Sequence, residues 1–403
     1  MAKRIIGIQE KLPLTQGVPL ALQHVFAMFG ATVLVPYLTG LNPSTALLTS
    51  GLGTLIFHLF TKGLVPAYLG SSFAFIAGLT YWVKAGNVPA AMGGAAAAGM
   101  VYLVVYLVIK LFGPEFINRY VPPVVVGPVV MIIGLSLANT AVSQMASTNW
   151  PVAVFALAVA VFFSVFGRGF WGVIPILLGI LAGYLLALLL TVAGVANLVD
   201  FSKIAAAPWV SLPVGKGGYH VPTFNAAAVL TLAPVAFVTI IEDLGHVFVI
   251  GNVTGQNMIE KPGFHRVLLG NGLATIVAAF LGGPPSTTYG ENIGVLAITG
   301  VYSAWVIRIA ALVAILLSLL GKVGAAIAAI PVSVMGGISI LLFGMIAAAG
   351  MRTLVDARLD LSQSRNLIIV SIILVLGIGL PERGVALATL AGIVLNLILP
   401  RGK

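Results

Sequence analysis

The sequence predicts an all-α polytopic membrane protein of about fourteen membrane-spanning segments. Hydrophobic residues fill 60% of the 403 positions, whereas charged residues fill only 7%. A typical soluble domain carries about 25% charged residues, and a soluble protein of this length would need far more polar surface to cover its core. The composition therefore excludes a soluble protein.

Long stretches of the chain lack Asp, Glu, Lys and Arg altogether, for example residues 12–61, 120–167 and 267–290. A helix needs about 20 apolar residues to cross a bilayer, so several stretches hold two crossings with a turn between them. The segments at 67–83, 285–299, 366–380 and 385–400 are short for a full crossing. We expect segments at 18–38, 45–61, 67–83, 89–112, 122–140, 151–166, 169–196, 225–250, 264–282, 285–299, 301–320, 329–349, 366–380 and 385–400.

The placement of the 20 Lys and Arg residues predicts the orientation of the chain. If the N-terminus is cytoplasmic and the segments alternate, most of these residues lie on the cytoplasmic side. Cytoplasmic loops are generally enriched in Lys and Arg, so we expect an even number of crossings and two cytoplasmic termini. The net charge of +10 is scattered over short loops and does not indicate nucleic-acid binding. The exceptions are Lys84, Lys203, Lys216, Lys322 and Arg383 on the outer side, and Arg308 within a segment.

Two parts of the chain resemble each other. Residues 71–74 in the third segment and 287–290 in the tenth both read hydroxyl, hydroxyl, aromatic, small, at an offset of 216 residues. The fifth and twelfth segments both open on proline, at Pro122 and Pro331. These matches predict two halves of seven segments each. Because seven is odd, the second half enters the membrane from the opposite side, so the repeat is inverted.

Inverted repeats with short, interrupted segments at matching positions point to the binding site of a secondary transporter. The third and tenth segments fit this description, since each is short and mixes β-favouring residues with Gly or Pro. We expect a short extended stretch that leads into a half-helix in each. Non-helical backbone at membrane depth persists only where it lines a cavity or is buried in protein.

Three acidic residues fall inside predicted segments, namely Glu242, Asp243 and Glu291. An ionisable group within a membrane segment is costly and indicates a functional site. Glu242 and His246 are four residues apart and share a helix face. Glu242 and Asp243 lie about 100° apart around the helix, so at most one of them points into a site. The alternative is a buried ion pair that fixes helix packing.

The predicted half-helices offer hydrogen-bond donors to the same place. A half-helix that starts near Gly290, or after Phe73, directs free N–H groups into the cavity and favours carbonyl oxygens and negative charge. Together with the carboxylates of Glu242 and Glu291, this pattern suits a flat heterocycle whose C=O and N–H groups alternate, such as uracil. Phe73 and Tyr289 are candidate aromatic walls, although such residues also serve helix packing.

The same residues are candidates for proton coupling. A carboxyl group in an apolar cavity holds a proton more readily than one in water, and histidine titrates near neutrality. Protonation would change the charge that a substrate meets, which would couple the two fluxes. We therefore assign proton coupling to Glu242, Asp243, His246 and Glu291. His24 is a candidate for helix packing or for a proton path.

Residues 291–300 match a family signature: Glu, Gln or Pro, then Asn, any residue, Gly, four residues of any kind, Thr, then Arg, Lys or Gly. With the runs 22–24, 70–75 and 288–292, the chain resembles the nucleobase–cation symporters, the family that includes xanthine and uracil permeases. Glu291 at the first signature position is similar to the uracil branch. The resemblance implies that uracil enters with protons by alternating access across the cytoplasmic membrane, as a transporter and not an enzyme.

The resemblance also implies an architecture. It implies one integral domain over 1–403, with a core subdomain at 18–112 and 225–320, a gate subdomain at 122–196 and 329–400, and a homodimer without cofactor or metal. Carried over to this chain, it implies that the substrate-binding residues are Ser72, Phe73, Glu242, His246, Tyr289, Gly290 and Glu291, with Phe73 and Gly290 acting through backbone N–H groups.

Two positions depart from the pattern of the uracil branch. Asp243 replaces an expected histidine beside the site glutamate, and Phe343 replaces an expected tyrosine in the gate. Three other functions stay open: a xanthine or purine symporter, an anion exchanger or channel on the same inverted-repeat fold, and a membrane enzyme. The acidic character of the predicted site disfavours the second. The absence of a nucleophile or metal cluster in the sequence disfavours the third.

Overall fold

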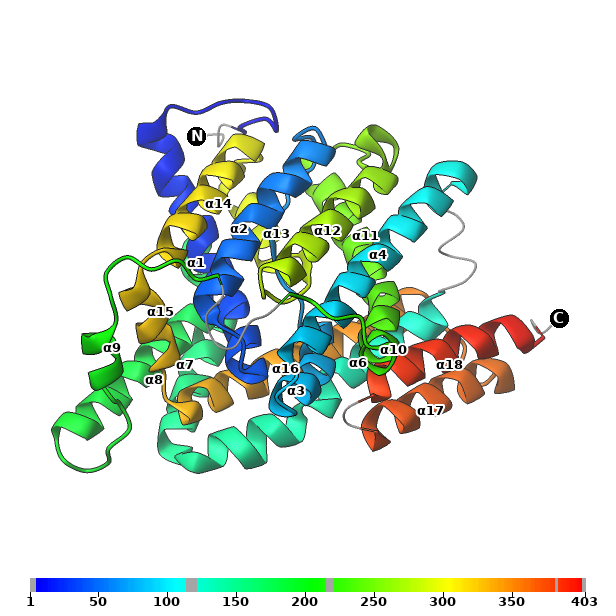
Figure 1. The fold of residues 1–403 in the computed structure, drawn as a ribbon. Coiled ribbons are helices and arrows are strands. Elements are labelled where there is room, and N and C mark those ends of the chain that lie inside the picture. Colours follow the sequence, from blue (N-terminus) through cyan, green and yellow to red (C-terminus); the bar gives the residue numbers. More distant parts are fainter. Residues whose placement is uncertain (1–4, 114–121, 215–220, 381–382, 401–403) are drawn as a thin grey trace.

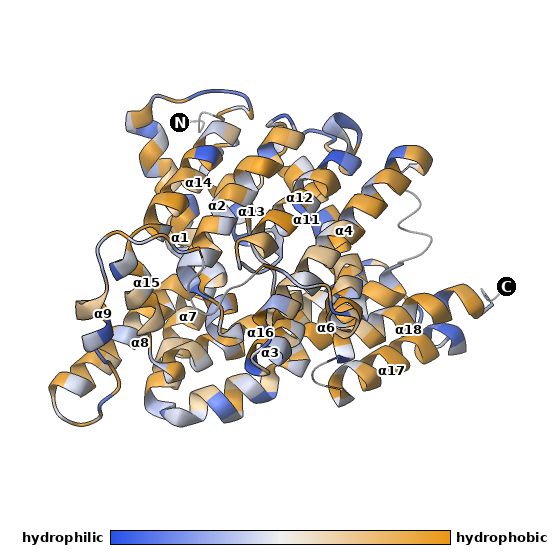
Figure 2. Cartoon of the chain, viewed as in Figure 1, coloured by the Kyte–Doolittle hydropathy of each residue, from blue (hydrophilic) through white to orange (hydrophobic). Residues whose placement is uncertain are grey.

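The computed structural model describes residues 5–113, 122–214, 221–380 and 383–400, and shows a helical protein with one two-stranded sheet (Figure 1). Within these ranges, eight helices are long and apolar enough to cross a membrane. Apolar residues dominate along the helices, and polar residues gather mainly at helix ends and in loops (Figure 2). This is the architecture of a polytopic membrane protein. The basic residues Lys3, Arg4, Arg119, Lys216, Arg401 and Lys403, which entered the predicted orientation, lie outside the described residues.

The first half of the chain forms the segments near their predicted places. The extended stretch predicted in the third segment is present as β1, and α3 follows it. The elements are α1 (Leu14–Thr39), α2 (Pro43–Phe60), β1 (Leu69–Ser71), the 3₁₀ turn η1 (Phe73–Phe75), α3 (Ile76–Lys84), α4 (Val88–Phe112), α6 (Pro123–Ser136), the π-helix η2 (Thr140–Met145), η3 (Ala146–Thr148), α7 (Trp150–Phe166), η4 (Gly169–Gly172), α8 (Pro175–Val192) and α9 (Ser202–Ala206).

The second half repeats the short strand and half-helix. As predicted, an extended stretch precedes a helix that begins at Gly290. The elements are α10 (Ala226–Leu232), η5 (Ala233–Val235), α11 (Ala236–Thr254), the π-helix η6 (Ile259–Gly263), α12 (Phe264–Phe280), β2 (Ser286–Thr288), α13 (Gly290–Thr299), α14 (Ala304–Ser318), α15 (Gly321–Ala328), α16 (Val332–Asp356), α17 (Ser364–Gly379) and α18 (Gly384–Ile398).

Two short helices, α9 and α15, were not predicted. They lie in the stretches between predicted segments and are only 5 and 8 residues long. A search for apolar runs of membrane length does not detect elements of this size. Every predicted segment overlaps a helix or a strand–helix unit of the structure, while the number that cross the bilayer stays a prediction.

Asparagine begins several of the membrane helices. The side chains of Asn42, Asn87, Asn149 and Asn225 each accept hydrogen bonds from backbone N–H groups in the first turn of α2, α4, α7 and α10. Such a cap satisfies donors that would otherwise be unpaired at a helix end. In α2, α4 and α7 a proline also stands in the first turn, where its missing N–H costs nothing. These local signals explain why the helices start where they do.

Helices from the two halves of the chain interleave. In Figure 1, α14, α2, α12 and α4 form a row in which yellow and yellow-green helices alternate with blue and cyan ones, and neighbours in this row are in contact. A second group joins α6, α7 and α8 with α16, α17 and α18 through contacts of α16 with α6 and α7, and of α17 with α6 and α18. The structure therefore has two helix groups, and each contains helices from both halves of the chain.

The outer face of α8 is apolar and uncovered. Leu181, Leu185 and Leu189 follow one another at four-residue spacing and are 55%, 55% and 58% exposed. Residues at this spacing share one face of a helix. An exposed leucine stripe on a protein of this composition matches the acyl chains of a bilayer.

The two strands pair with each other in the buried interior of the molecule. β1 and β2 pair antiparallel, with Leu69 opposite Thr288, Gly70 opposite Thr287 and Ser71 opposite Ser286. Their side chains are buried, and hydrogen bonds between the strands satisfy backbone groups that cannot reach water. The pairing brings the start of α3 and the start of α13 to one region.

Candidate functional site

A cavity of about 500 Å³ lies where the two paired strands end and the helices that follow them begin. Phe73, Glu242, His246, Thr287, Thr288, Tyr289, Gly290 and Glu291 line its inner wall. Its opposite wall is apolar and comes from the second helix group, with Ile174–Leu177 before and at the start of α8 and with Leu342, Met345 and Ile346 of α16. The structure therefore brings six of the predicted site residues to one cavity between the helix groups. Asp243 and Ser72 lie outside its lining, and Thr287 and Thr288 were not predicted.

Glu242 projects from α11 into the cavity. Its side chain is accessible, and its Oε2 atom accepts a hydrogen bond from Thr287 Oγ1 at 3.2 Å. Asp243, the next residue, is completely buried and lies outside the cavity lining. The 100° step between successive helical residues separates them. Of these two carboxylates, only Glu242 can meet a substrate.

The N-terminus of α13 supplies backbone donors. Tyr289 is its N-cap residue, no side chain caps it, and Gly290 and Glu291 occupy its first turn. The first N–H groups of a helix have no partner within the helix and attract carbonyl oxygens and anions. Because Gly290 and Glu291 both line the cavity, this helix end and a carboxylate face the same space.

The start of the first half-helix is arranged differently. Phe73 lines the cavity, but Ser72 is fully buried behind it. The Ser72 N–H donates to Pro285 O at 2.9 Å, and Ser72 Oγ accepts from the Ala74 N–H at 3.3 Å. The structure thus places Ser72 as a helix cap outside the cavity, so its predicted contact with substrate is not part of the geometry.

Tyr289 forms a fixed side of the cavity. It is 3% exposed, and its hydroxyl donates to Ser71 O at 3.0 Å and accepts from Thr32 Oγ1 at 3.3 Å. Its ring lies against Gly70, where even a Cβ atom would overlap it. A buried tyrosine whose hydroxyl makes two hydrogen bonds is a rigid wall of the cavity.

His246 lies one turn after Glu242 and also faces the cavity. Its Nδ1 atom is 2.9 Å from Thr288 Oγ1. A Cβ atom placed on Gly290 would lie 3.3 Å from His246 Nε2. The imidazole is therefore held by β2 on one side and approaches the N-terminus of α13 on the other. A glycine at position 290 leaves room for this approach.

The threonines of β2 were not predicted as site residues. Thr287 contacts Glu242, and Thr288 contacts His246, so the strand holds two of the four side chains predicted for proton coupling. Their pairing with the third segment gave a signal in the sequence, since the hydroxyl pair is repeated at an offset of 216 residues. The apolar wall gave none, because leucine and isoleucine are common throughout the chain.

Three further polar residues are placed by the structure away from the cavity. His24 is buried, and Asn292 Nδ2 lies 3.1 Å from both His24 O and His24 Nδ1, so His24 joins α1 to α13. His58 is 1% exposed, and its Nε2 lies 2.9 Å from Ala67 O. Arg308 Nε donates to His58 Nδ1 at 3.3 Å. The Arg308 contact joins α14 to α2, and the Ala67 contact joins α2 to the segment that precedes β1.

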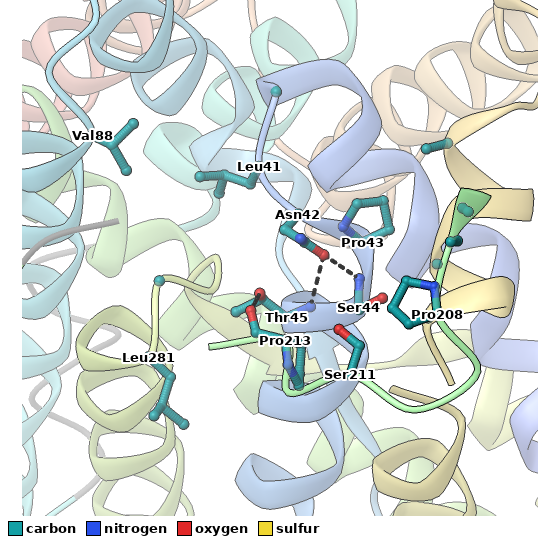
Figure 3. A pocket seen from close by; sticks show the side chains of 17 residues that line it. Leu41, Asn42, Pro43, Ser44, Thr45, Val88, Pro208, Ser211, Pro213 and Leu281 are labelled. Carbon is teal, nitrogen blue, oxygen red and sulfur yellow. Dashed lines mark hydrogen bonds between the residues drawn. The ribbon is translucent and has the colours of Figure 1, made fainter. Parts of the chain in front are cut away.

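A second cavity, of about 380 Å³, lies near the start of α2 (Figure 3). Asn42 caps α2 there, and Thr45 Oγ1 donates to Pro213 O at 2.7 Å. The lining contains no ionisable side chain. It has the polar groups of a loop junction but not the acid–base chemistry of the first cavity, and among described residues no cluster of His, Asp or Glu could hold a metal ion in either place.

Comparisons with known proteins place the chain among permeases. It matches the profile described as "Permease family", that of xanthine and uracil permeases, over residues 15–383. The chain belongs to the xanthine/uracil permease family, whose members are transporters and not enzymes.

Individual relatives cover almost the whole chain. It is 50% identical to the uracil permease of Bacillus caldolyticus, over 99% of this chain and 96% of that protein. It is 44% identical to the uracil permease of Escherichia coli (strain K12), over 99% and 94%. It is 42% identical to the putative pyrimidine permease RutG of the same strain, over 98% and 92%.

Solved structures share the fold at low sequence identity. The transmembrane domain of a cyanobacterium bicarbonate transporter, BicA, aligns with a TM-score of 0.63 and 16% identity, covering 98% of this chain and all of that one. The murine Slc26a9 anion transporter aligns with a TM-score of 0.70 and 11% identity, covering 97% and 69%. The fold is thus that of membrane transporters.

Proposed function

We propose that this chain imports uracil together with protons across the cytoplasmic membrane. The observation that carries the proposal is the meeting of the Glu242 and Glu291 carboxylates with the uncapped N-terminus of α13 in one cavity. Carboxylates accept hydrogen bonds from ring N–H groups, and helix N–H groups donate to ring carbonyl oxygens. Uracil presents both kinds of group in alternation. Relatives named uracil permease at 42–50% identity support this substrate.

The surroundings of the cavity support a neutral, flat substrate. Phe73 and Tyr289 offer aromatic surface, and the facing wall from α8 and α16 is apolar. No Lys or Arg belongs to the cavity lining. An anion exchanger needs a positive field where its substrate binds. The likeness to anion transporters is therefore one of fold, and the chemistry of the cavity favours a base over an anion.

Alternating access follows from where the cavity lies. One helix group supplies the strands, α11 and α13, and the other supplies α8 and α16. We propose that the first group, 18–112 and 225–320, is the core and that the second, 122–196 and 329–400, is the gate. Rocking of one group against the other would open the cavity to each side in turn. The pairing of a strand from each half supports an inverted repeat. The bias of Lys and Arg supports about fourteen spanning segments with cytoplasmic termini. We further propose a homodimer.

Proton coupling is proposed for Glu242, His246 and Glu291, because all three face the substrate cavity. A protonated glutamate donates where an ionised one only accepts, so proton uptake changes which hydrogen bonds the substrate can make. Binding of substrate and proton would then depend on each other. Asp243, which was also predicted for proton coupling, lies outside the cavity lining and cannot meet the substrate directly.

The test is uptake of labelled uracil into proteoliposomes that contain the whole chain. We expect accumulation when the outside is more acidic than the inside, and loss of accumulation on adding a protonophore. Unlabelled uracil should compete fully and xanthine weakly. Strong competition by xanthine would replace the substrate with a purine. Accumulation that resists the protonophore but requires sodium would replace the coupling ion, and sulfate or bicarbonate exchange without uracil uptake would overturn the proposal.

A further inference from the structure

A carboxylate lies behind the cavity and is held without a cation. Asp243 is 0% exposed, and no Lys, Arg or His pairs with it in the described part of the chain. Five donors surround it instead. Oδ1 accepts from the Thr288 N–H at 3.0 Å, from Thr288 Oγ1 at 2.8 Å and from Thr287 Oγ1 at 3.3 Å, although the Thr287 hydroxyl also contacts Glu242. Oδ2 accepts from Tyr102 OH at 2.9 Å and also from Asn271 Nδ2. Such a ring of donors stabilises an ionised carboxylate.

The orientation of this network is set from its far end. Ser286 Oγ donates to Asn271 Oδ1 at 3.1 Å, so the amide of Asn271 directs its nitrogen to Asp243. The backbone N–H of Thr288 can only donate. Each oxygen of Asp243 thus accepts from a fixed donor, as suits the ionised carboxylate that this ring of donors stabilises, and an ionised carboxylate has no proton to give. Thr288 Oγ1, the hydroxyl nearest to the carboxylate at 2.8 Å, therefore points its proton at Oδ1.

Thr288 passes this constraint to His246. Its hydroxyl has one proton, and that proton is directed to Asp243 Oδ1 at 2.8 Å. The same oxygen lies 2.9 Å from His246 Nδ1 and has only lone pairs left for that contact. A hydrogen bond there requires the proton to be on Nδ1. In a neutral imidazole, Nε2 is then the unprotonated acceptor.

We propose that Asp243 is a positioning residue that acts through Thr288 to hold His246 in its Nδ1–H tautomer, with the Nε2 lone pair presented to the cavity. Nε2 is the ring atom that approaches the Gly290 position at the start of α13. It would add a third acceptor to the carboxylates of Glu242 and Glu291, for a ring N–H of the substrate or for a proton. This role deepens the proposed function and rests on it for the identity of the substrate.

A positioning role accounts for the place of Asp243, which is next to Glu242 in the chain but outside the cavity lining. A second-layer group that fixes the tautomer of a functional histidine through its other ring nitrogen is a general device in proteins. Here the Thr288 hydroxyl lies between the Asp243 carboxylate and the His246 imidazole. The strand β2 carries that hydroxyl, so the position of the strand and the protonation pattern of His246 are set together.

The direct test is nitrogen NMR of the whole chain, labelled with ¹⁵N-histidine and kept in lipid nanodiscs without substrate at a pH at which His246 is neutral. The two ring nitrogens of a neutral imidazole differ widely in chemical shift according to which carries the proton. His246→Gln identifies the signals of this residue among the five histidines. We expect a protonated Nδ1 and an unprotonated Nε2. A protonated Nε2 in the wild type would overturn the inference, whatever the substrate.

Variants of Thr288 distinguish a role of its hydroxyl in positioning His246 from a purely structural role. Thr288→Val removes the hydroxyl at nearly constant size and should shift His246 towards the Nε2–H tautomer, while Thr288→Ser should keep Nδ1–H. Thr389→Val is the matched control, because Thr389 Oγ1 donates only to Val385 O in its own helix, and it should change nothing. An unchanged tautomer in Thr288→Val would refute the relay. If that variant does not fold, the wild-type spectrum and Thr288→Ser still decide.

Uracil binding to the same samples gives a second measurement. The loss of one hydrogen bond to a partly buried group corresponds to roughly a tenfold weaker affinity, which we expect for Thr288→Val and not for Thr288→Ser. If the wild type shows Nδ1–H but binds no uracil, the proposed substrate is wrong and the positioning role stands. If it binds uracil but shows Nε2–H, the proposed substrate stands and the positioning role is wrong.

Discussion

The two paired strands have matching backbones but different anchors. Neutral hydroxyls of α2 hold β1: Leu69 N donates to Thr54 Oγ1 at 2.9 Å, and Ser50 Oγ donates to Leu69 O at 2.6 Å. A carboxylate of α11 holds β2, since Asp243 accepts both the N–H and the hydroxyl of Thr288. The frame is therefore similar in the two halves, whereas the charge belongs to the second half alone.

The helices that follow the two strands also differ, both in the capping and in the charge of their first turn. At the start of the first, Ser72 caps the chain with its own side chain and no acidic residue follows in the first turn. The second, α13, has no side-chain cap and carries Glu291 in its first turn. One half thus offers a capped, neutral end with an aromatic ring, and the other offers open donors beside a carboxylate. This difference indicates that the first half supports the cavity and the second recognises what enters it.

The largest effect should come from the carboxylates of the second half. Glu242→Ala and Glu291→Ala should each abolish detectable uracil uptake, because hydrogen bonds to charged groups contribute about 1.5–3 kcal/mol each and bias both substrate and proton binding. Uptake by proteoliposomes, with the amount of inserted protein measured in parallel, checks this expectation.

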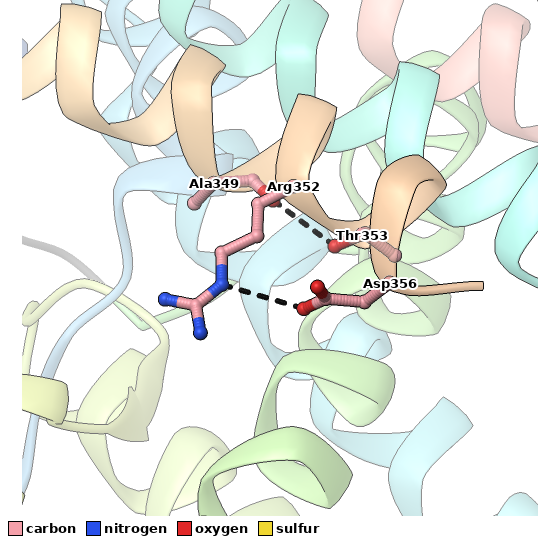
Figure 4. Close-up of polar contacts among 4 residues, drawn as sticks. All are labelled: Ala349, Arg352, Thr353 and Asp356. Carbon is pink, nitrogen blue, oxygen red and sulfur yellow. Dashed lines mark hydrogen bonds and ion pairs between the residues drawn. The ribbon is translucent and has the colours of Figure 1, made fainter. Parts of the chain in front are cut away.

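The matched control for these variants is Asp356→Ala. Asp356 is an acidic residue of the second half whose exposed ion pair with Arg352, at 3.3 Å, lies at the end of α16 (Figure 4). Exposed pairs contribute about 1 kcal/mol or less, so uptake should stay near the wild-type rate. Normal transport by either glutamate variant would remove the basis for assigning recognition to the second half.

The two anchors should differ in their contribution to stability. Asp243→Asn places an amide nitrogen among donors and leaves at least one of them unpaired, and Thr54→Val removes the acceptor for the Leu69 N–H. We expect the first change to lower the free energy of unfolding by about 2–3 kcal/mol and the second by about 1–2 kcal/mol. Thermal unfolding in detergent ranks the two variants. A larger loss of stability for Thr54→Val than for Asp243→Asn would show that the anchor of β1 contributes more than the anchor of β2.

Much of the frame was predictable because its physics is local in sequence. The length of an apolar run determines where a helix can cross, and the repeated hydroxyl pair located both strands before any contact was known. The same logic located Glu242, Glu291 and the start of α13. A step of one residue around a helix also showed that Glu242 and Asp243 could not both face the cavity.

The rest depended on contacts between distant segments. Periodicity did not indicate which of the two acids faces inward, since that depends on where Tyr102 and Asn271 lie. The family resemblance implied that Ser72 contacts the substrate, but its backbone N–H and its side chain are committed to Pro285 and Ala74. The apolar wall from α8 and α16 had no signal, because its residues are chemically like the lipid-facing ones.

A close approach between the halves offers a finer test. Gly70 faces Thr287 across the strand pair, and a Cβ atom at Gly70 would overlap the Tyr289 ring. Because that ring is buried and held through its hydroxyl, Gly70→Ala should lower stability by about 1–3 kcal/mol, the usual cost of overpacking. It should also weaken uracil binding by displacing the wall. Gly344→Ala, at a helical glycine with open space around it, is the control and should behave like the wild type in both assays.

The smallest effect should come from the cap of the first half-helix. Ser72→Ala removes the acceptor for the Ala74 N–H, which costs about 1 kcal/mol of stability at a helix start. The Ser72 N–H that donates to Pro285 O is unaffected, so the strand pairing should persist. Uracil affinity should change by less than about threefold, since the hydroxyl does not line the cavity. Binding measured by calorimetry, alongside thermal unfolding, distinguishes a cap from a ligand. A loss of affinity as large as that of Glu291→Ala, without a loss of stability, would make Ser72 a substrate contact and would give the first half a share in recognition.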